Sequence, residues 1–147
     1  QPATDTKLLQ QEYWQGLKDF LESAKSFVKM QNPLPQHWAN IAIGRSYFHL
    51  SATVNSRDNS LNIWLNLTGE RAKENYDKLR EISYEISLKE VSKDLVWDRM
   101  EGRKMSAVML KASGDFTDRG AWKDQFQWFK ENLERFSNFF KPLVAKL

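Results

Sequence analysis

The central part of the chain alternates between apolar and polar residues with a period of two, which is typical of strands half-buried in a sheet. In one segment Phe48 and aliphatic residues point to one side, and His49 and hydroxyls point to the other. A later segment repeats this pattern with Ile63 and leucines opposite Trp64 and asparagines. The alternation predicts a three-stranded antiparallel meander with an aliphatic face and a polar-aromatic face. We expect its strands at residues 38–43, 47–55 and 61–67, and its turns at residues 44–46 and 55–60.

Helical periodicity precedes the meander. Apolar residues recur every three or four positions from Lys7 to about Met30, and Pro33 lies just beyond the end of this pattern. A proline disfavours helical angles in the residue before it, so the helix should end there. Asp5 and Thr6 are expected to cap the start of this helix with their side-chain oxygens.

Two further helices are predicted after the meander. One follows the break at Thr68-Gly69, and the other begins near Asp118 and carries an aromatic stripe. Pro142 should kink or end the last helix. The residues expected to face the core are Ala72, Tyr76, Leu79, Ile82 and Ile86 in the second helix, and Trp122, Phe126, Phe129, Leu133, Phe136, Phe140 and Leu143 in the last.

A second hairpin is expected between these two helices, with strands at residues 95–100 and 105–112 and a turn at 101–104. Strands that come in groups, rather than alternating with helices, predict an α+β domain. We therefore expect one mainly antiparallel five-stranded sheet with the helices packed on it. Residues 1–6 are expected to form a flexible lead-in or linker, and residues 7–147 a single domain.

Composition narrows the class of protein. The formal net charge is +3, because 19 carboxylates offset 22 basic residues, and so charge alone does not argue for a nucleic-acid partner. The absence of cysteine excludes disulfides, thiol nucleophiles and thiolate metal sites, and it suits a reducing cytoplasm. No apolar run approaches the roughly 20 residues that a transmembrane helix requires.

No motif indicates a catalytic centre. His37 and His49 are the two histidines and fall on different strands, which gives no zinc spacing. Ser51 lies about 6.6 Å from His49 along one strand, too far for a direct hydrogen bond. The carboxylates near the second hairpin lack the order of a metal-dependent nuclease, because Glu101 falls in a turn and Lys104 comes one place late. The sequence therefore predicts no enzyme activity, no bound metal and no cofactor.

The polar-aromatic face instead predicts a binding surface, because amides, hydroxyls, an imidazole and indoles can stack on and hydrogen-bond to bases. The same groups suit a face that docks against another domain or a second copy, or one that simply meets water. A small enzyme built around His37 or His49 is a third class of function. The candidate nucleic-acid-binding residues are Trp38, His49 and Trp64, which would stack on or read bases, and Arg45, Arg57, Arg103 and Lys104, which would contact phosphates.

The central stretch resembles a known family. The residues that carry the resemblance are Pro35-Gln36-His37-Trp38, then Ile41, then Ile43-Gly44-Arg45-Ser46 and Phe48-His49-Leu50. This pattern is similar to a bacterial and archaeal family catalogued as domain of unknown function 4268. Trp122, and Trp128 inside the aromatic helix, are similar to that family's C-terminal stretch, so the resemblance covers nearly the whole chain from about Leu8.

The resemblance implies a context rather than an activity. The family has no assigned activity, so the resemblance gives no catalytic residue to any position. Its members often form the C-terminal part of longer proteins whose N-terminal part resembles a restriction-endonuclease-like nuclease. We therefore expect a cytoplasmic, non-catalytic accessory module that binds or positions DNA or RNA beside a fused or associated nuclease-type domain, for example in defence against foreign DNA. The alternative is a protein-interaction or homodimerisation module that uses the same face.

Overall fold

A computed structural model describes residues 4–147 of the chain. Within that range the chain forms three α-helices, one short 3₁₀ helix and five strands, which confirms the predicted α+β class and the order of its elements. Residues 1–3, the first part of the expected lead-in, lie outside the described residues. The elements are α1 (Asp5–Ser23), β1 (Trp38–Ala42), β2 (Phe48–Asn55), β3 (Ser60–Leu67), α2 (Ala72–Glu90), β4 (Val96–Asp98), β5 (Ser106–Ser113), η1 (Arg119–Ala121) and α3 (Trp122–Val144).

The five strands form one sheet in the order β1-β2-β3-β5-β4, and each neighbouring pair is antiparallel. The second hairpin joins the meander along β3, so that Leu61 pairs with Ala112 and Leu67 pairs with Ser106. β3 is therefore the central strand. The predicted strand limits agree with the structure to within one residue, except at β4, which has only 3 residues.

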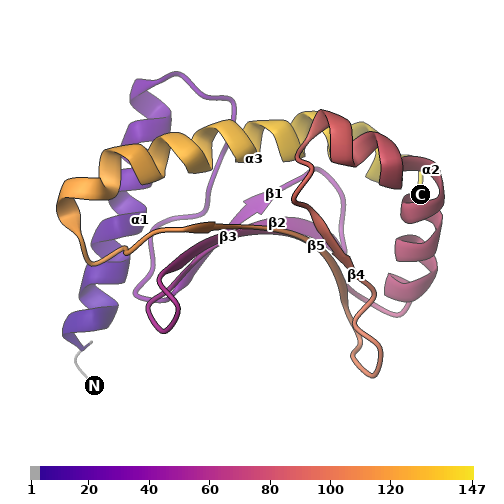
Figure 1. The fold of residues 1–147 in the computed structure, drawn as a ribbon, viewed down its shortest axis with the longest axis horizontal. Helices are drawn as coiled ribbons and strands as arrows, with labels where there is room; N and C mark the ends of the chain where they lie inside the picture. The colour runs from indigo at the N-terminus through magenta and orange to yellow at the C-terminus, as the bar shows by residue number, and fades with distance from the viewer. Residues whose placement is uncertain (1–3) are drawn as a thin grey trace.

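The helices cover one face of the sheet. In Figure 1 the sheet arches beneath α3, which runs across its convex side, while α1 lies beside one end of α3 and α2 beside the other. Leu50, Ile63 and Leu65 point toward the helices, and each is fully buried. The predicted division into an aliphatic and a polar-aromatic face is confirmed. In the described part of the chain no helix lies across the concave side.

α1 packs an aromatic face against α3. Tyr13 and Trp14 are completely buried, and the Tyr13 ring lies edge-on to Phe126 with centroids 4.9 Å apart. The Tyr13 hydroxyl donates a hydrogen bond of 2.9 Å to Gln125 Oε1. Gly16 permits this close approach of α1 to α3, because a Cβ at that position would lie 2.9 Å from the Phe126 ring.

α1 begins earlier than predicted. Its first residue is Asp5, and the N-cap is Thr4 rather than Asp5 or Thr6. The Thr4 hydroxyl accepts a hydrogen bond of 3.2 Å from the backbone N–H of Lys7. This bond satisfies one of the N–H groups that the first helical turn leaves without a partner.

α1 also ends sooner, and the prediction that it reaches Met30 is wrong. Lys25 adopts the left-handed conformation with φ of 56°, and Ser26 N–H donates back to the Leu21 carbonyl at 2.9 Å. These features form a Schellman motif, which closes the helix. The apolar residues that follow fit a helical spacing by coincidence. Met30 instead forms a bridge with Ile41 of β1.

α2 is rotated relative to the prediction. Ile82 and Ile86 do not face the core, because their exposed fractions are 52% and 53%, whereas Ser83 and Ser87 are buried. The indole N–H of Trp97 on β4 donates to Ser87 Oγ at 3.1 Å. A serine leaves room for the indole against the helix, so the small residues face inward and the isoleucines face solvent.

α3 follows its predicted stripe. Phe129, Phe136 and Phe140 are fully buried. The helix passes through Pro142 and ends two residues later at Val144. Pro142 thus lies inside the last turn, where the loss of one backbone donor does not interrupt the packed part of the helix.

Lys73 of α2 holds the β4–β5 turn. Its ammonium group donates to the carbonyl oxygens of Met100 at 2.8 Å and Met105 at 2.6 Å. It also donates to the Arg99 carbonyl and to Ser106 Oγ, the latter at 3.1 Å. Hydrogen bonds from a charged donor are stronger than neutral ones, so these contacts fix the hairpin to the helix.

Lys73→Met should destabilise the protein by about 2 kcal/mol, because several carbonyl oxygens lose a charged donor while the apolar stem is kept. Urea denaturation followed by tryptophan fluorescence measures the change. Lys78→Met is the matched control on the same helix, since Lys78 is half-exposed and, among residues 4–147, pairs only with Glu74, at 3.1 Å. The control should lose less than about 0.5 kcal/mol. Equal losses would contradict the assigned role of Lys73.

Candidate functional site

The concave side of the sheet, called the open face from here on, carries side chains from all five strands. Strand pairing aligns these side chains in three rows that run across the sheet. The rows are Trp38, Thr53, Asn62 and Lys111; then Asn40, Ser51, Trp64, Met109 and Val96; then Ala42, His49, Asn66, Ala107 and Asp98.

Trp64 occupies the centre of the open face. It is the middle residue of the middle row and lies on the central strand. Trp38 and His49, the other two residues predicted to contact bases, lie in the rows on either side. The structure therefore brings the three predicted base-contacting residues onto one surface.

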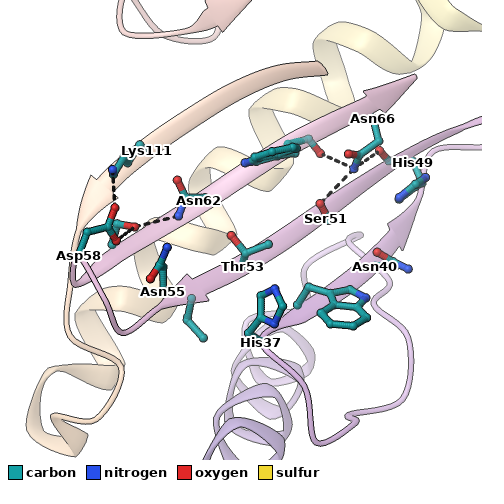
Figure 2. Close-up of a pocket in the computed structure, with 14 residues that line it drawn as sticks. His37, Asn40, His49, Ser51, Thr53, Asn55, Asp58, Asn62, Asn66 and Lys111 are labelled. Atoms are coloured by element: carbon teal, nitrogen blue, oxygen red, sulfur yellow. Dashed lines mark hydrogen bonds and ion pairs between the residues drawn. The ribbon is translucent and has the colours of Figure 1, made fainter. Parts of the chain in front are cut away.

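Asn66 forms the floor of the open face. This side chain is buried, and its amide nitrogen donates to Ser51 Oγ at 3.0 Å and to the His49 carbonyl at 3.3 Å. Figure 2 shows these bonds bridging β3 and β2. By contrast, within residues 4–147 the side chains of Asn40 and Thr53 form no hydrogen bond, so they can bond to a ligand.

A chain of polar contacts crosses the other end of the open face (Figure 2). Lys111 Nζ donates to Asp58 at 2.7 Å, Ser60 Oγ donates to Asp58 at 2.6 Å, and Asn62 Nδ2 donates to Ser60 Oγ at 3.0 Å. The hydrogen bond from Lys111 holds the pKa of the Asp58 carboxyl below its usual range. Lys111 therefore contributes little net positive charge to this surface.

The open face is hollowed by a shallow pocket of about 530 Å³. His37 and Trp38 form one side of it, with their ring centroids 4.7 Å apart and the rings edge-on. His49 lies in the same pocket, and burial lowers the pKa of its imidazole below the ordinary value of 6.5. His49 is therefore neutral at pH 7, and the middle of the open face is nearly uncharged.

Three of the four predicted phosphate contacts lie in turns. Arg57 is in the β2–β3 turn, and Arg103 and Lys104 are in the β4–β5 turn. Ser60, at one end of β3, adjoins the β2–β3 turn. Leu67, at the other end of β3, pairs with β5, the strand that follows the β4–β5 turn. Both turns project on the concave side of the arch, at opposite ends of the sheet (Figure 1).

Arg45 does not lie on the open face. Its Nη1 donates to the Val144 carbonyl at 2.5 Å, which satisfies a carbonyl at the end of α3. Its guanidinium carbon lies 5.4 Å from the centre of the Phe48 ring, and Phe48 belongs to the helix-covered side of β2. The seven predicted residues therefore do not form one surface, and Arg45 is separated from the others by the sheet.

Lys111 and Asp58 are residues of the open face that the sequence did not identify. In the sequence, Ala107, Met109 and Lys111 alternate with Val108 and Leu110. What the sequence lacked was the pairing of β5 with β3, which puts Lys111 beside Asn62.

The described residues hold no group of three or more histidine, aspartate or glutamate side chains that could bind a metal ion. The Ser51 hydroxyl accepts its hydrogen bond from Asn66. Over residues 4–147, no helix combines the length and the apolar character that crossing a bilayer requires.

The comparison with family models decides the relationship. The model of "Domain of unknown function (DUF4268)" matches residues 9–144. The chain belongs to this family. The resemblance that the central motif predicted is thus confirmed. No curated protein matches the chain.

One solved structure aligns with the chain at low similarity. A chain from the structure of the HopA1–SchA chaperone–effector complex aligns with a TM-score of 0.40 and 12% identity, covering 88% of this chain and 99% of that one. At this TM-score the likeness carries no argument about what this DUF4268 domain does.

The lowered pKa of His49 predicts a pH-dependent stability. Well above pH 6.5 the imidazole is neutral in both the folded and the unfolded state and contributes no difference in stability. As the pH falls below 6.5, the unfolded chain takes up a proton that the folded protein resists, so stability should decrease. Urea denaturation between pH 7.5 and about pH 5, the range in which imidazoles titrate, measures this loss. His49→Gln should reduce the loss, and an unchanged pH profile in this variant would contradict the assignment to His49.

Proposed function

We propose that this DUF4268 domain is a non-catalytic module that binds single-stranded nucleic acid on its open face and positions it beside a nuclease-type domain. The observation that carries the proposal is the partly exposed Trp64 indole at the centre of an uncovered sheet, with amides and hydroxyls around it. A duplex hides the flat faces of its bases, whereas a single strand can offer them to an indole.

The spacing of the rows supports contact with bases. Side chains at neighbouring positions of a row lie about 5 Å apart. A base stacked on Trp64 is therefore within reach of polar groups on the adjacent strand β2, including the free side chain of Thr53, and Asn40 lies one strand farther away on β1. These amide and hydroxyl groups can both donate and accept, as the edges of bases require.

The distribution of charge supports a nucleic-acid strand that runs across the open face between the turns at the two ends of β3. Bases are neutral and phosphates are charged. The open face is nearly neutral in the middle because His49 is uncharged, and at one end Lys111 pairs with Asp58. Arg57 lies beyond one end of β3, and Arg103 and Lys104 lie beyond the other. β3 has 8 residues and therefore extends about 26 Å. One extended nucleic-acid strand can thus place bases over Trp64 and phosphates at both turns.

The wider context is part of the proposal. The module contributes no reacting group, and cleavage belongs to the nuclease-type domain that family members often carry. Such a pair would act in the cytoplasm on DNA or RNA, for example on foreign DNA. This assignment rests on the resemblance described above and on the surface of the sheet.

The binding of a fluorescently labelled single-stranded oligonucleotide tests the proposal. Trp64→Ala should weaken binding by about tenfold or more, because stacking on an aromatic side chain contributes about 1–3 kcal/mol per base. Affinity should also fall as salt rises, and Arg57→Gln should reduce the slope of log K against log salt by about 0.7. Fluorescence anisotropy with both DNA and RNA measures each effect.

Phe27→Ala is the matched control, since Phe27 is a large aromatic residue, 52% exposed, that lies outside the open face. It should leave affinity unchanged, and Trp64→Phe should retain most of it. If neither DNA nor RNA binds at about 50 mM salt, where phosphate contacts are strong, the proposal fails.

A second candidate, homodimerisation, is favoured by the apolar half of the middle row. Trp64, Met109 and Val96 lie side by side across β3, β5 and β4, and Val96 is 54% exposed at the edge of the sheet. A second copy could cover this apolar row with its own, as the two-fold symmetry of homodimers requires.

Light scattering over a range of concentrations tests this candidate. A dimer that forms through the apolar row should dissociate in Val96→Asp, because the new carboxylates would be buried close together. Circular dichroism should show that the variant stays folded, since Val96 is exposed. A monomer at all concentrations, or a dimer that Val96→Asp does not affect, would eliminate this interface.

A further inference from the structure

A second hollow lies away from the open face, at the N-terminus of α2. It has a volume of about 580 Å³ and is enclosed by the segment that joins β1 to β2 and the segment that joins β3 to α2. Its lining includes Arg45, Tyr47, Gly69, Arg71 and Asn75.

Asn75 lines this hollow with an amide that lacks a partner. The residue is only 6% exposed. Its backbone N–H donates to the Arg71 carbonyl at 2.8 Å, as in any helix, but within residues 4–147 its side chain forms no hydrogen bond. Because no fully buried polar atom in that range lacks a partner, the amide must open onto the hollow. Because the amide has no partner within residues 4–147 and opens onto the hollow, its two donors and its acceptor are available to a ligand bound there.

The charges around the hollow favour an anion. Arg45 uses one N–H group for the Val144 carbonyl and, among the described residues, forms no ion pair with a carboxylate. Arg71 pairs with Glu74 at 3.1 Å, but Glu74 is shared with Lys78. Glu70, which also lines the hollow, offsets only one of these positive charges.

The start of α2 adds the positive end of a helix dipole. Arg71 is the N-cap, and no side chain caps the helix. The free N–H groups and positive dipole of a helix N-terminus attract anions, and guanidinium groups match the oxygens of a phosphate.

An exposed aromatic ring is held in a fixed position at the rim. Tyr47 has φ of 72°, and its carbonyl accepts hydrogen bonds from Thr68 N–H at 2.9 Å and Thr68 Oγ1 at 3.1 Å. The Tyr47 ring packs on Gly69, where a Cβ would lie 2.7 Å from the ring. Even so, Tyr47 is 67% exposed, so a face of the ring is available to a ligand.

We infer that this hollow binds the phosphate group of a nucleotide-like ligand. The donors are the guanidinium groups of Arg45 and Arg71 and the amide of Asn75, beside the positive end of the α2 dipole. The hollow has room for more than a phosphate, and the ligand can be a free nucleotide or the 5′-phosphorylated end of a strand. The inference does not depend on binding at the open face.

Calorimetric titration of the whole chain with inorganic phosphate, at constant ionic strength, tests the site. One phosphate should bind per chain, and Asn75→Leu should weaken it by about tenfold, the effect of losing one hydrogen bond to a charged group. The same variant should not lower the unfolding temperature in the absence of phosphate, because the amide has no protein partner to lose. A merely structural asparagine would give the opposite result, with a lowered unfolding temperature and unchanged phosphate binding.

Arg45→Gln should also weaken binding, and Arg135→Gln is the control, since Arg135 lies on the exposed side of α3. A nucleoside monophosphate and a 5′-phosphorylated oligonucleotide, each compared with its dephosphorylated form, identify the source of the phosphate. Their preference should disappear in Asn75→Leu and persist in Trp64→Ala, which separates this site from the open face. The inference is overturned if the unaltered chain binds no phosphate or if Asn75→Leu binds it equally well.

Discussion

The packing of α3 on the aliphatic face of the sheet is the interaction on which the other features depend. Phe129, Leu133, Phe136 and Phe140 are fully buried along one side of this helix. Burial of such side chains contributes about 1.5–3 kcal/mol each, so this layer is a main source of stability. α1 and α2 then complete the core at the two ends of α3 (Figure 1). Because the sheet has two faces and α3 covers one, the other is available for binding.

The open face stays ordered without a covering layer because its polar groups bond to one another. Asn66 joins β3 to β2, and Asp58 connects the β2–β3 turn to Lys111 on β5. These contacts use some donors and acceptors and leave others, including those of Asn40, for a ligand. They also neutralise the lysine of this surface, so that what it offers a partner is flat rings and hydrogen bonds rather than charge.

The basic side chains of this protein differ in what they contact. Lys73 and Arg45 donate to backbone carbonyls and so hold the β4–β5 turn and the end of α3. Arg57, Arg103 and Lys104 project from turns at opposite ends of the sheet. Arg45 also lines the hollow beside α2, together with Asn75 and Arg71. The basic residues therefore lie in three separate regions: the β4–β5 turn, the β2–β3 turn and the hollow beside α2. The number of basic residues in the sequence does not reveal this distribution.

The sequence by itself determined the elements, because alternation and helical spacing are local properties. It placed His49 and Trp64 on one face, because residues two apart in a strand share a side and the aliphatic side of each strand was expected to face the helices, and it offered Trp38 as a further residue of that face. It also identified the family, through the motif around Gly44-Arg45. Only the tertiary structure decided which edge of the meander receives the second hairpin, and hence that Lys111 lies beside Asn62. It also decided the rotation of α2, where room for Trp97 outweighs the burial of Ile82 and Ile86. Arg45 could not be assigned from the sequence because its partner, the Val144 carbonyl, lies 99 residues away along the chain.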